Sequence, residues 1–339
     1  MAKRLVCLGV GEIGWQNVED RPLQEGEVKV SNRYGVEKHG TMQAFVKGYA
    51  NERGRWDAEN CLHVAQGVLW GYPIPLGNMQ YGEIEESRSD LQPGQTVVYS
   101  GAFQERAIVR AEECFVVPGR VPWKTCMLQD PGEFAMGAIR DGHVRLGDKV
   151  AVFGLGAIGL LTVQMAKLAG ASQVVAVDPL PARREAAIRS GADHVVDAAG
   201  EDPGLEVRKL TEMKGVDVAI DFSGARPALQ AAIRGVAYGG TVVCGAFPPP
   251  YDAGLDFGGE AHMNRPRIVF SRACSDPNPD HPRWDWDRIR REVWRLISMN
   301  CLDGEPIVGP VVGWDELEDA YRKIASSPND TIKLAVRYP

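Results

Sequence analysis

Short apolar runs alternate with longer segments of helical character between residues 148 and 272. The apolar runs are DKVAVFG (148–154), QVVAVD (173–178), DHVVDA (193–198), VDVAIDFSG (216–224), GTVVCGAF (240–247) and RPRIVFSR (265–272). The first two intervals contain LLTVQMAKLAG (160–170) and ARREAAIRSGA (182–192), which are long enough for helices and include glycine at or near their ends. Strands that alternate with helices of about 10–15 residues predict βαβ units and a parallel sheet.

The first 120 residues follow a different pattern. Short β-branched runs at 27–31, 95–100, 106–111 and 114–119 are separated by turn signals such as Pro93-Gly94 and Pro118-Gly119. This part of the chain predicts a β-rich domain. After residue 272 comes a proline-rich, charged segment (276–287), which we expect to cross the surface. Helices at 286–299 and 315–326 and a strand at 331–338 complete the predicted elements.

Length and charge narrow the class of protein. A chain of 339 residues favours two domains. Its net charge of −7 argues against nucleic acid or an anionic membrane as a partner. No apolar run approaches the roughly 18 residues that a membrane span needs. The N-terminal sequence is not typical of a signal peptide, so a cytoplasmic location is expected. The seven scattered cysteines contain no C-x-x-C pair and are expected to be reduced thiols.

Two stretches carry the spacing G-x-G-x-x-G, which is associated with dinucleotide binding. In FGLGAIGL (153–160) a strand precedes the motif, a helix follows it, and Asp178 ends the next strand about 20 residues further on. This context predicts a pyrophosphate site, with Asp178 accepting the ribose hydroxyls and favouring NAD over NADP. Arg183 and Arg184 follow closely and could flank adenine or face solvent. In LGVGEIGW (8–15) the following segment contains Pro22 and Gly26, and a β-hairpin is predicted instead.

The chain resembles the medium-chain dehydrogenase/reductase family, the relatives of zinc-type alcohol and polyol dehydrogenases. The stretch from VRLGDKVAVFGLGAIG to GADHVVD is similar to the family's nucleotide-binding segment, and DFSGARPALQ and WDELEDAYRKIAS are similar to its later signatures. The resemblance implies an α/β fold. It consists of a GroES-like β-barrel domain from both chain ends (1–130 and 273–339) and a Rossmann NAD-binding domain with a doubly wound parallel sheet (131–272). It also implies a homodimer or homotetramer.

The resemblance breaks down at the family's catalytic zinc ligands. In YGVEKHGTM (34–42), Glu37 or Lys38 stands where the family has its cysteine, and Asn78 and Met79 stand where a histidine is expected. Asp130 or Glu133 falls near the third ligand, and the four-cysteine structural zinc lobe is absent. Losing thiolate and imidazole together removes most of the affinity of a tetrahedral zinc site. We therefore predict no metal. A site rebuilt from His39, Glu37 and Asp130, or simple salt bridges among these groups, are the alternatives.

Without zinc, a side chain must take the proton of the substrate hydroxyl. The candidates in the matching region are Tyr34, Glu37, Lys38, His39, Asn78 and Glu133. Lys38 and His39 behind Glu37 are the first choice. Glu133 follows a proline-glycine pair, which we expect to form a turn before a helix, so it could cap that helix instead.

The resemblance also assigns residues to the cofactor and suggests a substrate class. The candidate cofactor-binding residues are Gly154, Gly156, Ala157, Ile158, Gly159, Asp178, Arg183, Ser223, Gly245 and Ala246. Five tryptophans could stack on a sugar or could fill cores: Trp56, Trp70, Trp123, Trp284 and Trp286. A polar loop (47–60) could select a polyhydroxylated substrate. The leading hypothesis is a zinc-independent, NAD-dependent dehydrogenase of a sugar, polyol or cyclitol. The alternatives are an NADPH-dependent quinone or enoyl reductase and a non-catalytic NAD-binding protein.

Overall fold

The computed structural model describes residues 2–200, 202–327 and 331–339, except for the side chain of His39. The chain divides into two compact units. Unit 1 is Met1–Met127 with Val308–Pro339, and unit 2 is Leu128–Ile307. The predicted boundaries differ from this division mainly at residues 273–307, which belong to unit 2. All seven cysteines are free thiols.

Unit 2 is built on a parallel sheet. Within the described residues this sheet has six strands in the order β13-β12-β11-β14-β15-β16, and every pair is parallel. The strands are β11 (Lys149–Phe153), β12 (Gln173–Asp178), β13 (His194–Asp197), β14 (Val216–Asp221), β15 (Val236–Cys244) and β16 (Arg267–Phe270). The four central strands are mostly buried, which explains why they are nearly continuous apolar runs rather than alternating ones.

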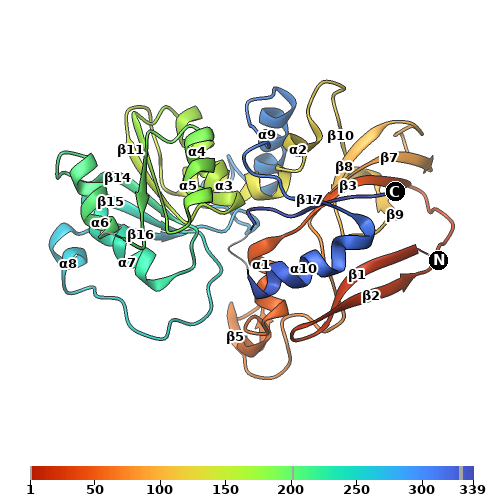
Figure 1. Ribbon diagram of the computed structural model, residues 1–339, viewed down its shortest axis with the longest axis horizontal. Helices are drawn as coiled ribbons and strands as arrows, with labels where there is room; N and C mark the ends of the chain where they lie inside the picture. Colours follow the sequence, from red (N-terminus) through yellow and green to blue (C-terminus); the bar gives the residue numbers. More distant parts are fainter. Residues whose placement is uncertain (1, 201, 328–330) are drawn as a thin grey trace. The chain divides into compact units, whose positions relative to one another are not determined.

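Helices connect these strands and cover the sheet. They are α3 (Gln129–Asp141), α4 (Ala157–Leu168), α5 (Pro181–Arg189), α6 (Pro203–Leu210), α7 (Arg226–Gly235), α8 (Glu260–Asn264) and α9 (Trp286–Ser298). In Figure 1, α4 and α5 lie on one side of the sheet, and α6 and α7 lie on the other. This is the doubly wound arrangement that right-handed crossovers produce on both sides of the first strand.

Helix α9 belongs to unit 2 because it packs against α3. Its residues Ile289, Val293 and Ile297 are buried, and Gln129 of α3 donates a hydrogen bond from Nε2 to the carbonyl of Arg290 at 3.0 Å. The helix that we predicted at 286–299 is therefore present, but its packing extends unit 2 to residue 307.

Unit 1 consists mainly of antiparallel strands. Its strands are β1 (Ala2–Gly9), β2 (Glu12–Val18), β3 (Glu27–Val36), β4 (Arg55–Asp57), β5 (Leu62–Val64), β6 (Ile74–Pro75), β7 (Met79–Ser87), β8 (Thr96–Ser100), β9 (Arg106–Arg110), β10 (Phe115–Val116), β17 (Val311–Gly313) and β18 (Ala335–Arg337). The largest sheet has the order β10-β8-β7-β3-β18-β17, with β9 also paired to β3. The remaining sheets are β2-β1-β6 and β4-β5. Since β17 and β18 come from the C-terminal part of the chain, both chain ends build this unit.

Three α-helices and three short 3₁₀ helices complete the described part of unit 1. They are α1 (His39–Val46), α2 (Trp123–Cys126), α10 (Leu317–Ser326), η1 (Asn51–Arg53), η2 (Ala111–Glu113) and η3 (Trp314–Glu316). Phe45 of α1 and Tyr321 of α10 share one apolar core with Leu5 of β1. A parallel-sheet Rossmann unit and a separate sheet unit confirm the predicted α/β fold class.

The first glycine motif forms a hairpin. Strands β1 and β2 pair antiparallel, with Leu5 opposite Trp15 and Gly9 opposite Glu12, and the turn lies at residues 10–11. The hairpin prediction for LGVGEIGW is confirmed. Among the described residues, no helix combines the length and the hydropathy that crossing a bilayer requires.

Candidate functional site

The second glycine motif forms a tight turn between β11 and α4. Gly154 has φ +84°, and a Cβ atom there would lie 2.5 Å from the backbone N and Cα of Ser223. At Gly159, a Cβ atom would lie 1.9 Å from the carbonyl oxygen of Gly154. Glycine is therefore required at both positions. At Gly154 it allows the backbone conformation, and at Gly159 it allows close packing of helix and strand.

The turn leaves the start of α4 open. Gly156 is the N-cap of α4, and nothing lies within 4 Å of where its Cβ atom would be. Ala157 and Ile158 follow as the first residues of the helix. The first backbone N–H groups of a helix have no partner within the helix and lie at the positive end of its dipole. The arrangement can therefore bind the pyrophosphate of a dinucleotide.

Asp178 ends β12 beside this turn. Its carboxylate is almost fully buried and accepts hydrogen bonds from Leu155 N at 2.8 Å and from Leu180 N at 2.9 Å. The side chain thus ties the glycine turn to the end of the neighbouring strand. Both oxygens keep further acceptor capacity because each carboxylate oxygen has two lone pairs. Ribose hydroxyls at this strand end would meet an acceptor that the backbone already holds in place.

The two arginines after β12 have different contacts. Arg183 Nη1 lies 3.7 Å from the Asp178 carboxylate. Arg184 donates to the backbone carbonyl of Asp178 at 2.8 Å and to Asp197 Oδ2 at 3.0 Å. Arg184 therefore joins the ends of β12 and β13, whereas Arg183 lies beside the carboxylate itself. Of our two alternatives, a purely solvent-facing position does not describe either arginine.

Ser223, Gly245 and Ala246 follow the carboxyl ends of β14 and β15. Ser223 donates to Asp221 Oδ1 from its hydroxyl at 2.6 Å and from its backbone N–H at 2.8 Å. Gly245 N donates to the carbonyl of Asp221 at 3.0 Å. Burial raises the pKa of Asp221 to about 6, and the Ser223 hydrogen bonds only partly offset this effect. Asp221, which we did not single out from the sequence, organises this strand end; the acid that closes VDVAID is the signal for it.

In unit 1, Glu37 directly follows β3 and Asn78 directly precedes β7, and these two strands are paired. The register of β3 and β7 places Gly35 opposite Gln80, and Glu37 and Asn78 continue it by two residues. Both are buried, and the carbonyl of Asn78 accepts from Gly101 N at 2.7 Å. The paired strands β3 and β7 therefore bring together the two positions at which the resemblance implied a cysteine and a histidine ligand.

Glu37 is held by the segment before β18. Its Oε1 accepts from Leu334 N at 2.9 Å, and its own N–H donates to the carbonyl of Leu334 at 3.0 Å. The buried Lys333 donates from Nζ to the carbonyl of Glu37 at 2.6 Å. Lys333 is a second residue that sequence reasoning missed, because this contact joins positions almost 300 residues apart. Lys38 follows at the N-cap position of α1 and is half-buried, and His39 is the first residue of that helix.

Glu133 lies inside α3 of unit 2, so the predicted turn before a helix is wrong. The helix begins at Gln129 and includes Pro131 and Gly132, since a proline in the first turn lacks only an N–H that has no helical partner. A helix-capping role is therefore not available to Glu133. Its carboxylate instead accepts from Trp286 Nε1 at 2.7 Å and from Gln129 Nε2 at 3.0 Å.

The surroundings of Glu133 change its proton affinity. Burial raises its pKa to about 7, helped by the nearby Asp130, whereas the two hydrogen bonds and Arg290 at 3.9 Å act in the opposite direction. Glu133 therefore exchanges its proton near neutral pH and links α3 to α9.

The donor set does not fit a tetrahedral zinc ion. Glu37 uses one carboxylate oxygen for a backbone N–H, and Lys38 and Asn78 supply neither a thiolate nor an imidazole. Within the part of the chain that the structure describes, no three His, Cys, Asp or Glu side chains form a group that could hold a metal ion. The side chain of His39 lies outside the described residues, so the alternative site with His39, Glu37 and Asp130 stays a hypothesis.

The candidate tryptophans have separate surroundings. Trp70 stacks on Phe45 with ring centroids 4.6 Å apart, and Trp56 meets His63 edge to face. Trp284 lies under the guanidinium groups of Arg140 and Arg288. Trp123 stacks on Tyr34, and Trp286 donates to Glu133.

A six-stranded parallel sheet with a glycine turn, joined to a sheet unit from both chain ends, defines a dinucleotide-binding dehydrogenase architecture. A family described as "Zinc-binding dehydrogenase" matches residues 157–285, and a relative is 38% identical along almost the whole chain. The chain belongs to this family of medium-chain alcohol and polyol dehydrogenases.

The relative with 38% identity is D-guloside 3-dehydrogenase of Escherichia coli (strain K12). The match extends over 350 residues and covers 99% of this chain and 100% of the relative. The solved structure of 2R,3R-butanediol dehydrogenase from Bacillus subtilis has a TM-score of 0.78, 21% identity and 99% coverage of both chains. A zinc-binding dehydrogenase structure from Sinorhizobium meliloti 1021, bound to NADP, has a TM-score of 0.78, 21% identity and the same coverage.

Proposed function

We propose that this protein is a nicotinamide-dependent dehydrogenase that oxidises a secondary hydroxyl of a sugar, polyol or cyclitol without a catalytic zinc ion, with NAD as its cofactor. The observation that carries the proposal is the β11–α4 turn, where Gly154, Gly159 and the buried Asp178 form a dinucleotide cradle. The full-length similarity to a guloside dehydrogenase supports a sugar derivative as substrate and makes a glycoside the first compound to test.

The residues of unit 2 fit a dinucleotide. The N-terminus of α4 would bind the pyrophosphate, and Asp178 would accept the ribose hydroxyls. Ser223, Gly245 and Ala246 lie at the carboxyl ends of the strands, the edge where ligands bind in open α/β sheets. A nicotinamide bound there would supply the acceptor for the hydride of the carbinol carbon. A 2′-phosphate would meet the negative charge of Asp178, which favours NAD. Arg183 at 3.7 Å reduces this effect, so the preference needs a direct test.

A side chain of this protein would then take the hydroxyl proton. Lys38 is our first candidate because it is half-buried at the start of α1, where the Glu37 contacts to Lys333 and Leu334 fix its backbone. His39 is the neighbouring alternative. Asn78 can donate or accept a hydrogen bond, and Glu133 can accept a proton near neutral pH. Glu37 would support Lys38, because its Oε1 accepts from Leu334 N and its carbonyl accepts from Lys333 Nζ.

The zinc-free mechanism rests on the donor set at the two strand ends. Glutamate and asparagine at these positions lack the soft ligands that select zinc. We further propose that the protein forms a homodimer or homotetramer.

The test is a substrate panel with metal analysis. Purified protein is assayed for NADH formation with hexose glycosides, hexoses, polyols and cyclitols, and its zinc content is measured in parallel. We expect NADH formation with at least one panel member at a zinc content far below one per chain. A strong preference for NADPH with quinones or enones would support the reductase alternative. Saturable NAD binding without turnover of any compound would support a non-catalytic protein.

A further inference from the structure

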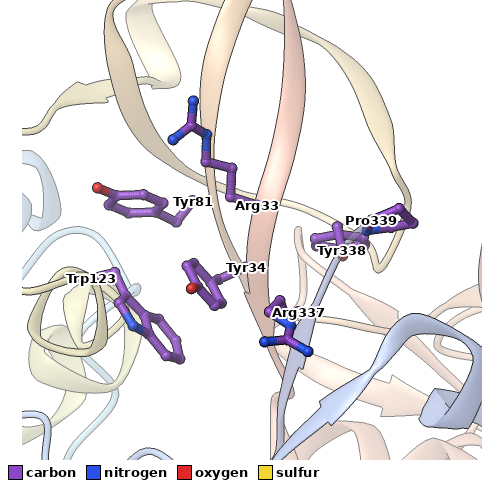
Figure 2. Close-up of a pocket in the computed structure, with 7 residues that line it drawn as sticks. All are labelled: Arg33, Tyr34, Tyr81, Trp123, Arg337, Tyr338 and Pro339. Atoms are coloured by element: carbon purple, nitrogen blue, oxygen red, sulfur yellow. The ribbon is translucent and has the colours of Figure 1, made fainter.

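A pocket on unit 1 is built from a row of side chains across three adjacent strands. The registers place Arg337 of β18 opposite Tyr34 of β3, and Tyr34 opposite Tyr81 of β7. Residues directly opposite each other in antiparallel strands lie on the same face of a sheet, so the three side chains form one continuous row. With Trp123 they line a hollow of about 330 Å³ (Figure 2). None of these four residues belongs to the dinucleotide cradle, and Tyr34 lies on β3 three residues before Glu37.

Two aromatic rings make a rigid wall of this pocket. Tyr34 and Trp123 stack with their centroids 4.0 Å apart and their planes within 7° of parallel. Tyr81 meets Tyr34 edge to face at 6.2 Å. Figure 2 shows the three rings gathered on one side of the pocket. The strand end beside the pocket is fixed as well, because the buried Tyr338 hydroxyl donates to Gln80 Oε1 at 2.7 Å and accepts from Gln104 N at 3.2 Å.

Of the two arginines that line the pocket, Arg337 is available to a ligand. Arg33 pairs with Glu83 and points away from the rings (Figure 2). Arg337 is exposed, and its guanidinium has no ion pair or hydrogen bond with any residue that the structure describes. Three further groups have no hydrogen-bond partner among the described residues. They are the hydroxyls of Tyr34 and Tyr81 and the indole N–H of Trp123. The pocket thus combines aromatic rings with one free positive charge, two hydroxyls and one N–H donor.

We propose that this pocket of unit 1 binds a monosaccharide that carries a carboxylate, such as a hexuronate, at a site distinct from the dinucleotide cradle of unit 2. Aromatic rings pack against the apolar face of a sugar, and the phenol hydroxyls and indole N–H match its hydroxyls. The guanidinium of Arg337 matches a carboxylate, which it can bind with two parallel hydrogen bonds. The volume is at the lower end of the range for small-molecule sites, which suits one sugar ring. A sugar phosphate shares this chemistry and is distinguished by experiment.

The experiment measures binding of D-glucuronate to the full chain by isothermal titration calorimetry and saturation-transfer NMR. The comparison compounds are glucose 6-phosphate, inorganic phosphate and the neutral methyl glucoside. We expect saturable binding of glucuronate at millimolar concentration or below, and weaker binding of the neutral glycoside. Arg337→Gln should weaken glucuronate binding at least tenfold, because a charge-assisted pair is lost. Trp123→Leu should weaken the acid and the neutral sugar together.

Control variants test whether glucuronate binds at this pocket. Arg189→Gln removes an exposed arginine of α5 in unit 2 and should leave glucuronate binding unchanged. Arg337→Gln should also leave NADH binding unchanged, a readout that does not depend on the proposed reaction. If Trp123→Leu fails to fold, Trp123→Phe tests the same wall.

Three results would overturn the proposal. The first is equal glucuronate binding in Arg337→Gln and the unchanged protein. The second is tighter binding of inorganic phosphate or glucose 6-phosphate than of glucuronate. The third is an oligomer that dissociates on Arg337→Gln, since this face of unit 1 would then be a subunit contact.

Discussion

Replacing Glu133 with glutamine should change how the stability of the protein depends on pH. Glutamine has nearly the shape of glutamate but does not ionise. The pKa of Glu133 is raised from 4.5 to about 7, mainly by burial between α3 and α9. A carboxyl group with a raised pKa favours folding in its neutral form. Its contribution is therefore fully present below pH 4.5 and is lost as the pH rises through about 7.

The magnitude follows from the two pKa values. The rise to about 7 corresponds to about 3 kcal/mol between the acidic and the alkaline limit, and about 2.5 kcal/mol of this falls between pH 5 and pH 8. The conversion is appropriate because the side chain of Glu133 is only 8% exposed, so solvent screens it little. Glu133→Gln should also lose one of the two hydrogen bonds from Trp286 and Gln129, since an amide has one acceptor oxygen where the carboxylate has two.

Urea unfolding at pH 5 and pH 8 measures this effect. Two probes, far-UV circular dichroism and tryptophan fluorescence, test whether the transition of this two-unit chain is cooperative. The compared quantity is the change in the free energy of unfolding between the two pH values, because other groups such as Asp221 contribute to it equally in both proteins. We expect the unchanged protein to lose about 2.5 kcal/mol more than Glu133→Gln. Glu185→Gln, an exposed change on α5, should show the pH dependence of the unchanged protein. An identical pH dependence of Glu133→Gln and the unchanged protein would refute the reasoning.

Three further predictions concern the proposed reaction. Elemental analysis should find far less than one zinc ion per chain, and EDTA should leave the dehydrogenase rate unchanged; stoichiometric zinc lost together with activity would contradict the donor-set argument. Asp178→Ser should weaken NADH binding at least tenfold and NADPH binding less, because the charged acceptor for the ribose hydroxyls is removed; parallel fluorescence titrations measure both, and equal losses would speak against a ribose contact. Lys38→Met should lower kcat about 100-fold or more with the KM for NAD unchanged, while Lys323→Met on α10 should have no effect. If the rate of Lys38→Met is undiminished, Lys38 is not the proton acceptor, and His39 or Glu133 becomes the next candidate.

Much of unit 2 could be predicted from local sequence patterns. The run QVVAVD corresponds to β12 residue for residue, and the strand, glycine turn and helix around Gly154 lie where the motif indicates. These elements can be predicted because their signals are local. Apolar periodicity, glycine spacing and helix-forming composition can each be recognised within about ten residues. The same local reasoning separated the β1–β2 hairpin from the dinucleotide turn, because Pro22 and Gly26 are incompatible with a helix after the first motif.

Local patterns were less informative where a residue's role depends on what packs against it. Pro131-Gly132 was expected to form a turn before a helix, yet α3 already begins at Gln129 and includes both residues, and Gln129 is bonded to α9. The same packing puts residues 273–307 in unit 2 rather than with the chain ends. The sequence shows that Glu133 is acidic, but its pKa near 7 arises only from the burial and the contacts that α9 provides.

The sequence by itself therefore determined the strand–helix alternation, the glycine turn before α4 and the β1–β2 hairpin. The tertiary structure alone decided which distant residues share a surface. Tyr34, Tyr81 and Arg337 form one row only because β18 pairs with β3 and β3 with β7 in one register. A shift of that register by one residue would turn the side chains of a strand to the opposite face. Contacts of this kind depend on strand pairing across about 300 residues, which no local pattern encodes.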